Sequence, residues 1–117
     1  MSGARRFGLT ALVLGVFAAP AVAQERVYSG TEAQALQCAA YVSYTPLVLE
    51  RRGLMSARDT QEAAVDATLI LGSHVSGTYD QKRRAFEIAL SRLPQSENAL
   101  ISEAVRRAGW CKEKFLR

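Results

Sequence analysis

Apolar residues recur every three or four positions along most of the chain that follows residue 30, a period typical of amphipathic helices. The pattern predicts a helix over 31–44, a long one from Ala57 to about Ser76, a third between Thr78 and Pro94, and a last one after Ser96. No segment shows the strict alternation of a half-buried strand. The sequence therefore predicts an all-α fold, a small antiparallel helical bundle of four to five helices.

Each expected helix begins at a capping signal. A serine or threonine at the N-cap accepts a hydrogen bond from the amide three positions on, and a glutamine at that position can return the bond. The expected N-caps are Thr31 (with Gln34), Ser56 (with Asp59), Thr78 (with Gln81) and Ser96. Residues 24–30 then precede the first helix as a flexible lead-in to a helical domain over 31–117.

Two residues leave helix boundaries open. Pro46 has no amide proton and disfavours helical geometry at Thr45, so it either kinks the first helix or ends it. If the first helix ends there, Thr45 caps a separate short helix over 46–52. Gly109 either ends the last helix or costs about 1 kcal/mol inside it relative to alanine. Continuation of the helix past Gly109 is favoured, because Phe115 keeps the three- and four-residue spacing of the apolar positions.

The apolar positions also predict which face of each helix is buried. In the second helix these positions are Ala63, Ala64, Ala67, Thr68, Ile70, Leu71 and Val75; in the third they are Tyr79, Phe86, Ala89, Leu90 and Leu93; in the last they are Leu100, Ile101, Ala104, Val105, Ala108, Cys111 and Phe115. Many of these residues are alanines, which let helix axes approach closely.

The first 23 residues have the pattern of a cleaved signal peptide. Arg5 and Arg6 precede an apolar run over 7–19, and Ala21-Val22-Ala23 supplies the small residues that a signal peptidase recognises, with cleavage expected between Ala23 and Gln24. The run is shorter than the roughly 20 apolar residues that span a bilayer. The chain is therefore expected to be periplasmic or secreted.

Length and charge describe a single small domain once this segment is removed. The chain has 117 residues and a formal net charge of +4, of which Arg5 and Arg6 contribute two charges. A domain of fewer than 100 residues buries only about 60% of its unfolded surface, so a covalent link would add substantially to its stability.

Cys38 and Cys111 are the two cysteines of the chain, and an exported protein with an even number of cysteines is expected to oxidise them. A Cys38–Cys111 disulfide would join the first helix to the last, so the segment from Thr31 to Tyr44 is the element around which the domain is arranged. The loop-entropy relation gives about 4 kcal/mol for such a bridge. Redox catalysis favours a Cys-x-x-Cys spacing, and metal or haem sites need further ligands, so no cofactor is expected.

Candidate catalytic groups are few, and no catalytic residue is assigned. His74 lies near the end of the second helix, where a capping or surface role is favoured. Asp59, Glu62 and Asp66 follow the spacing of a solvated helix face. A small hydrolase that uses His74 or a carboxylate pair is the enzyme-class alternative.

The candidate partner-binding residues are aromatic or basic. Tyr41, Tyr44 and Trp110 are expected to gather around the disulfide, and Tyr and Trp concentrate binding energy at interfaces. Arg106 and Arg107 belong to a basic group near the C-terminus, and Lys82-Arg83-Arg84 form a second one. These features predict a protein partner in the cell envelope; nucleic acid is not expected, and contact with a membrane surface is disfavoured.

The sequence thus predicts a small exported helical protein that acts as a binding or accessory module. In its helical content and single disulfide, the expected domain resembles small periplasmic acid-stress chaperones. The resemblance implies a chaperone that loosens and exposes apolar surface at about pH 2 to 3. No sequence motif supports this resemblance, and no family is assigned.

Overall fold

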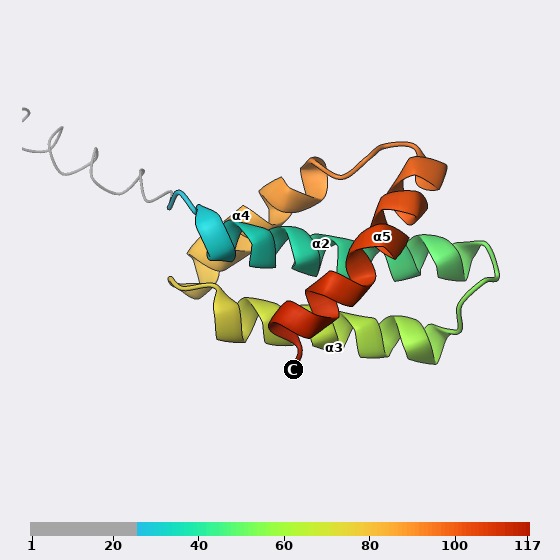
Figure 1. Ribbon diagram of the computed structural model, residues 1–117, viewed down its shortest axis with the longest axis horizontal. Coiled ribbons are helices and arrows are strands. Elements are labelled where there is room, and N and C mark those ends of the chain that lie inside the picture. The colour runs from blue at the N-terminus through green and yellow to red at the C-terminus, as the bar shows by residue number, and fades with distance from the viewer. Residues whose placement is uncertain (1–25) are drawn as a thin grey trace, which may run out of the picture.

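The computed structural model describes residues 26–117, so the expected signal peptide and its cleavage site lie outside the described residues. The described chain forms four helices without a strand: α2 (Gly30–Arg51), α3 (Ala57–His74), α4 (Tyr79–Ser91) and α5 (Glu97–Phe115) (Figure 1). The prediction of an all-α bundle is confirmed.

Helix α2 is the centre of the arrangement. Helix α3 runs back along α2 after the turn at 52–56, while α4 and α5 cross α2 at other positions (Figure 1). Each of these three helices packs mainly on α2 rather than on the others. The expectation that the 31–44 segment organises the domain is therefore confirmed.

Small side chains explain how one helix can contact three others. Ala35, Ala39 and Ala40 have no exposed surface. Ala35 and Ala39, four positions apart, face the first core cluster, whereas Ala40 faces the second. A methyl group lets a neighbouring helix approach more closely than a larger side chain would. Tightly packed alanines therefore fix the positions of the outer helices.

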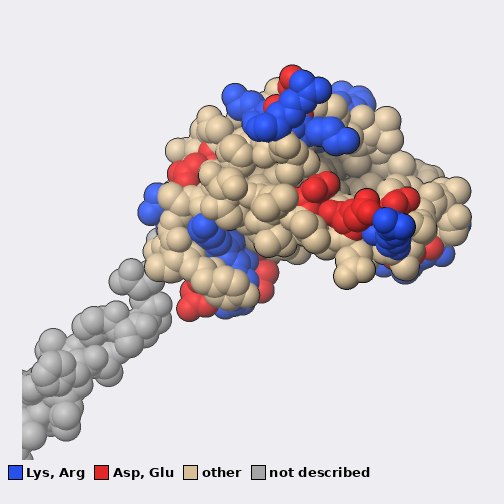
Figure 2. Space-filling view, turned by 90° about the horizontal axis from the view of Figure 1, so that it is seen from below, with Lys and Arg blue, Asp and Glu red and all other residues tan. Residues whose placement is uncertain are grey.

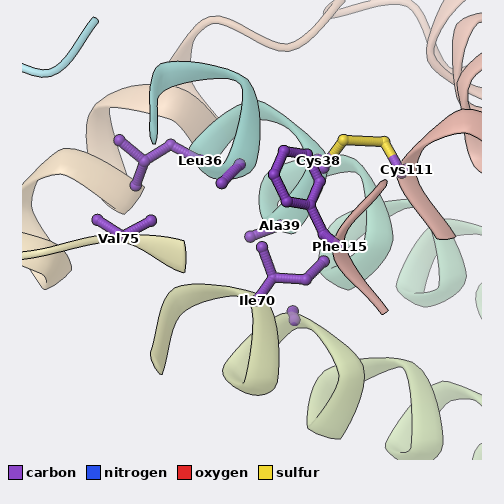
Figure 3. Packing of buried hydrophobic residues seen from close by; sticks show 9 residues of the cluster. Leu36, Cys38, Ala39, Ile70, Val75, Cys111 and Phe115 are labelled. Atoms are coloured by element: carbon purple, nitrogen blue, oxygen red, sulfur yellow. A yellow bond between two sulfur atoms is a disulfide. The ribbon is translucent and has the colours of Figure 1, made fainter. Parts of the chain in front are cut away.

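The core consists of two clusters along α2. The first joins α2, α3 and the end of α5, and its buried members are Ala35, Leu36, Cys38, Ala39, Ala67, Ile70, Val75, Cys111 and Phe115 (Figure 3). The second lies where α4 and the start of α5 meet α2, and its buried members are Ala40, Tyr41, Val48, Leu93 and Leu100.

The expected N-cap of the first helix is wrong by two residues. Helix α2 begins at Gly30 with Ser29 at the N-cap, and no side chain caps it. Thr31 therefore lies inside the helix. The tertiary contacts of this segment account for the difference, because Tyr28 and Glu32 both bind Ser76 on either side of the helix start.

Pro46 neither ends α2 nor begins a separate helix, because α2 continues to Arg51. Thr45 and Pro46 are buried, and the Thr60 hydroxyl of α3 lies 3.5 Å from the Pro46 carbonyl oxygen. Packing against α3 offsets the hydrogen bond that a proline removes from a helix. The open question is settled in favour of one continuous helix.

The N-caps of the other three helices agree with the sequence, and α3 ends at His74, two residues before the expected end. Ser56, Thr78 and Ser96 each accept a hydrogen bond from the amide three residues on, and Thr78 and Gln81 form a complete capping box. Helix α5 continues through Gly109 to Phe115, as expected.

Several residues expected on buried faces are exposed instead. Tyr79 is 77% exposed and Val105 is 71% exposed, and Ala64, Thr68 and Ala108 also face solvent. Helix α3 is rotated so that Thr60, Ala67 and Ile70 face the core, which leaves Val65 and Leu69 about half exposed. Apolar residues occur on more than one side of these helices, so periodicity alone does not fix the buried side.

Candidate functional site: a groove between α2 and α4

Helix α4 is much less buried than the other three helices of the described chain. None of its residues is fully buried, although Ala85, Phe86 and Ala89 pack partly against the core. Ile88 remains 40% exposed. Helices in proteins owe most of their stability to a packed apolar face, and that face of α4 is only partly covered.

A groove of about 1190 Å³ lies beside this partly covered face. We call it the α2–α4 groove; its lining residues are Arg26, Val27, Tyr28, Ala33, Gln34, Leu36, Gln37, Tyr41, Thr78, Asp80, Gln81, Arg83, Arg84, Ala85, Ile88, Ala89, Arg92 and Leu93. Leu36, Tyr41 and Leu93 are buried at its base. The groove thus has an apolar floor between two helices.

The charged residues of the groove are mostly arginines. Arg26, Arg83, Arg84 and Arg92 line it and are exposed, whereas Asp80 is the single acidic lining residue. Arg83 is partly neutralised, because its guanidinium lies 3.0 Å from Glu87 and 4.0 Å from Asp80. The groove therefore carries an excess of positive charge.

Three side chains hold one wall of the groove against the turn between α3 and α4. Arg26 donates to the Ser76 hydroxyl at 2.7 Å, and the Tyr28 hydroxyl donates to the Ser76 carbonyl at 2.7 Å. Glu32 accepts from the Ser76 amide at 2.6 Å. The Ser76 hydroxyl and amide, and to a lesser extent Arg26, hold the pKa of Glu32 below its ordinary value.

Gly77 makes this close approach sterically feasible. Its φ is +108°, and a Cβ atom at this position would lie 2.8 Å from the Tyr28 hydroxyl oxygen and 2.8 Å from Oε1 of Gln81. Both its backbone conformation and its neighbours therefore favour glycine.

Tyr41, which lines the groove, contacts Arg107 of α5. The guanidinium of Arg107 lies 5.2 Å from the centre of the Tyr41 ring, a distance suited to a cation–π contact. Arg107 also donates to Gln37 at 3.0 Å and to Glu103 at 3.1 Å. Arg106 and Arg107 together hold the pKa of Glu103 below its ordinary value. Helix α5 thus places Arg107 against two lining residues, Gln37 and Tyr41, although Arg107 does not line the groove itself.

The three aromatic residues expected around the disulfide occupy three different places. Tyr41 is buried in the second core cluster and lines the α2–α4 groove. Tyr44 lines a smaller hollow beside Pro94, and its hydrogen bond raises the pKa of Arg51. Trp110 is 46% exposed and packs edge-on against Phe115 at 5.7 Å. Of the basic candidates, Arg106 and Arg107 both pair with Glu103, and Arg107 also contacts the ring of Tyr41.

The predicted disulfide between Cys38 and Cys111 is present. The Cα atoms lie 5.7 Å apart, and both cysteines are buried. Phe115 lies between the bridge and Ile70 of α3 in the first core cluster (Figure 3). The bridge therefore fixes the end of α5 to the middle of α2.

His74 contacts the end of α5 rather than a catalytic partner. Its Nε2 atom lies 3.0 Å from the Phe115 carbonyl oxygen, to which a protonated Nε2 can donate, and its ring packs edge-on against the Phe115 ring at 5.0 Å. This contact satisfies a carbonyl at a helix C-terminus. The contact is made at the end of α5, not at the end of the histidine's own helix as expected from the sequence.

The carboxylates of α3 do not converge in a pocket. Asp59 and Glu62 are exposed, and Glu62 pairs with Arg58 at 3.5 Å. Figure 2 shows a short row of acidic side chains on one face and basic side chains in several separate groups. Within residues 26–117, no three potential ligands lie close enough to hold a metal ion, and none of the described helices combines the length and apolarity of a membrane span.

The α2–α4 groove was not predicted from the sequence. Its arginines come from three separate parts of the chain, and only Arg83 and Arg84 belong to a basic group that the sequence makes visible. The crossing of α2 and α4 that creates the groove is a tertiary feature.

No protein-family model matches the chain, and neither a curated protein nor a solved structure is significantly similar to it.

Proposed function

We propose that this protein is an exported helical binding module, periplasmic or secreted, whose α2–α4 groove holds a helical segment of a protein partner in the cell envelope. The observation that carries the proposal is that α4 has no fully buried residue while a groove with apolar residues at its base lies along it. The leader pattern at the N-terminus and the disulfide support export, because disulfides persist in oxidising compartments.

The dimensions of the groove suit a helix. Helix α4 has 13 residues and is therefore about 20 Å long, which sets the length of an occupant lying beside it. The volume of the groove, about 1190 Å³, exceeds the roughly 300 to 1,000 Å³ of typical small-molecule pockets. Ala33, Ala85 and Ala89 line the groove, and their small side chains let another helix pack closely.

Photo-crosslinking in the producing cell tests the proposal. A crosslinking amino acid at Gln37, which lines the groove, should give an adduct with one defined envelope protein. Ile88→Glu should abolish the adduct, because a carboxylate would then enter the apolar centre of the groove. Leu69→Glu is the matched control, since Leu69 is 53% exposed and lies on α3.

The proposal fails if no Gln37 adduct forms. It also fails if the adduct survives Ile88→Glu or is lost equally in Leu69→Glu. Circular dichroism of both variants separates loss of binding from loss of folding.

An acid-activated chaperone is the second candidate, and the contact between Glu32 and Ser76 favours it. Protonation of Glu32 would weaken the hydrogen bond to the Ser76 amide that helps hold the groove wall. A chaperone of this kind would bind a hydrophobic dye and suppress client aggregation at about pH 2 to 3. Tight packing without any such suppression at that pH would eliminate it.

A further inference from the structure

Resting on the proposed function of the α2–α4 groove, we infer that its occupant is an acidic amphipathic helix, with an apolar stripe flanked by carboxylates at both ends. The groove combines an apolar floor with four arginines and a single aspartate. A partner with the opposite charge and a matching apolar stripe would satisfy both features.

All the positively charged residues that line the groove are arginines. A guanidinium presents a rigid fork of donors that pairs with a carboxylate through two parallel hydrogen bonds, which a lysine cannot reproduce. Within residues 26–117, no ion pair of this chain involves the Arg92 side chain. Arg92 is therefore the arginine best placed to donate hydrogen bonds to a partner's carboxylate.

The order of these residues along α4 predicts the order of charges in the occupant. Arg83 and Arg84 lie in the first half of α4, Ile88 and Ala89 follow, and Arg92 comes directly after the last residue. Arginines therefore lie on both sides of an apolar centre, with Arg83 paired within the chain to Asp80 and Glu87. A complementary helix has apolar residues at i, i+3, i+4 and i+7, with Asp or Glu before and after them.

The shape of the site favours a helix over an anionic membrane. Leu36 and Tyr41 lie buried at the base of the groove, whereas the arginines are exposed. A planar lipid surface would meet the exposed arginines without reaching the apolar floor. A helix fits between the arginines and covers Ile88 and Ala89 at the same time.

Binding of designed peptides tests this inference. The probe is a labelled helical peptide of about 14 residues with leucines at i, i+3, i+4 and i+7 and glutamates at both ends. Its control has lysines in place of the glutamates. Fluorescence anisotropy with the oxidised mature protein should show the acidic peptide binding at least about tenfold more tightly. Its affinity should also fall as salt rises from 0.1 M to 1 M, because the Debye length then shortens from about 10 Å to about 3 Å.

Three variants assign the effect to the groove. Arg92→Glu should weaken the acidic peptide about three- to tenfold, and Arg92→Lys should recover part of the loss because it keeps the charge without the fork. Arg58→Glu is the matched control and should leave the affinity unchanged, since Arg58 is 88% exposed on α3 and does not line the groove.

The outcomes separate this inference from the proposed function. Equal binding of both peptides, still abolished by Ile88→Glu, would overturn the inference and leave groove binding intact. Binding unaffected by Ile88→Glu would count against the groove itself. Vesicles of anionic lipid that displace the acidic peptide, or self-association that Arg92→Glu abolishes, would assign the groove to a lipid or a second copy and overturn the inference.

Discussion

Replacing both cysteines by alanine, Cys38→Ala with Cys111→Ala, should remove about 4 kcal/mol from the free energy of unfolding. The bridge joins residues separated by 73 positions, so it restricts most of the unfolded domain. Small domains have total stabilities of about 5 to 15 kcal/mol. The loss is therefore a large share of the total, and alanine keeps both positions small and apolar.

The loss of stability should be greatest in α5. The buried residues of α5 are Leu100, Cys111 and Phe115, and α5 packs mainly on α2. Without the bridge, the second half of α5 is held by Phe115, by its contact with His74, and by the exposed contacts of Arg107 with α2. Helices α2 and α3 keep their mutual packing, so amide exchange should accelerate more in α5 than in either of them.

Urea unfolding followed by circular dichroism measures the effect. With a urea slope of about 1 to 2 kcal/mol per molar, the midpoint should fall by roughly 2 to 4 M. Wild-type protein unfolded under reducing conditions should give nearly the same midpoint as the double variant. A shift below about 0.5 M, or mass spectrometry showing free thiols in native protein, would refute the reasoning.

Three further predictions concern single contacts. Ala39→Leu should destabilise the fold by at least about 1 to 3 kcal/mol, because Ala39 has no exposed surface; an unchanged melting temperature would contradict the close packing of α2. Thr78→Ala removes the capping box of α4 and should cost about 0.5 to 2 kcal/mol in urea unfolding, whereas Thr31→Ala, inside α2, should cost less. Because the folded-state pKa of Glu32 is lowered, its stabilising effect is complete above the ordinary carboxyl pKa and lost as pH falls through the lowered value. The stability difference between wild type and Glu32→Gln should therefore be present at pH 7 and vanish in acid; a constant difference across this range would contradict the role of Ser76.

The sequence predicted those parts of the fold that depend on local chemistry. Ser56, Thr78 and Ser96 cap helices because a hydroxyl near a free amide needs no tertiary partner. Thr31 has the same local pattern, yet contacts across the fold begin α2 earlier. Pro46 likewise stays helical because α3 packs against it.

The candidate site was less predictable because it also depends on contacts between helices. Tyr41 and Arg107 were both candidates for partner binding, and the structure brings them together at 5.2 Å. Their pairing depends on the crossing of α2 and α5, which residue spacing does not specify. Arg92 belongs to no basic group in the sequence and joins the site only because α4 lies along α2.

Because the outer helices pack on α2, the residues that stabilise the fold differ from the exposed residues that border the groove. A substitution at Ala35, Ala39 or Ala40 affects the support of several neighbours, because these alanines are completely buried. The exposed residues Ile88 and Arg92 border the groove without supporting α3 or α5. Specificity could thus be re-engineered on the outer surface of α4, by mutation or by selection, while the rest of the scaffold keeps its shape.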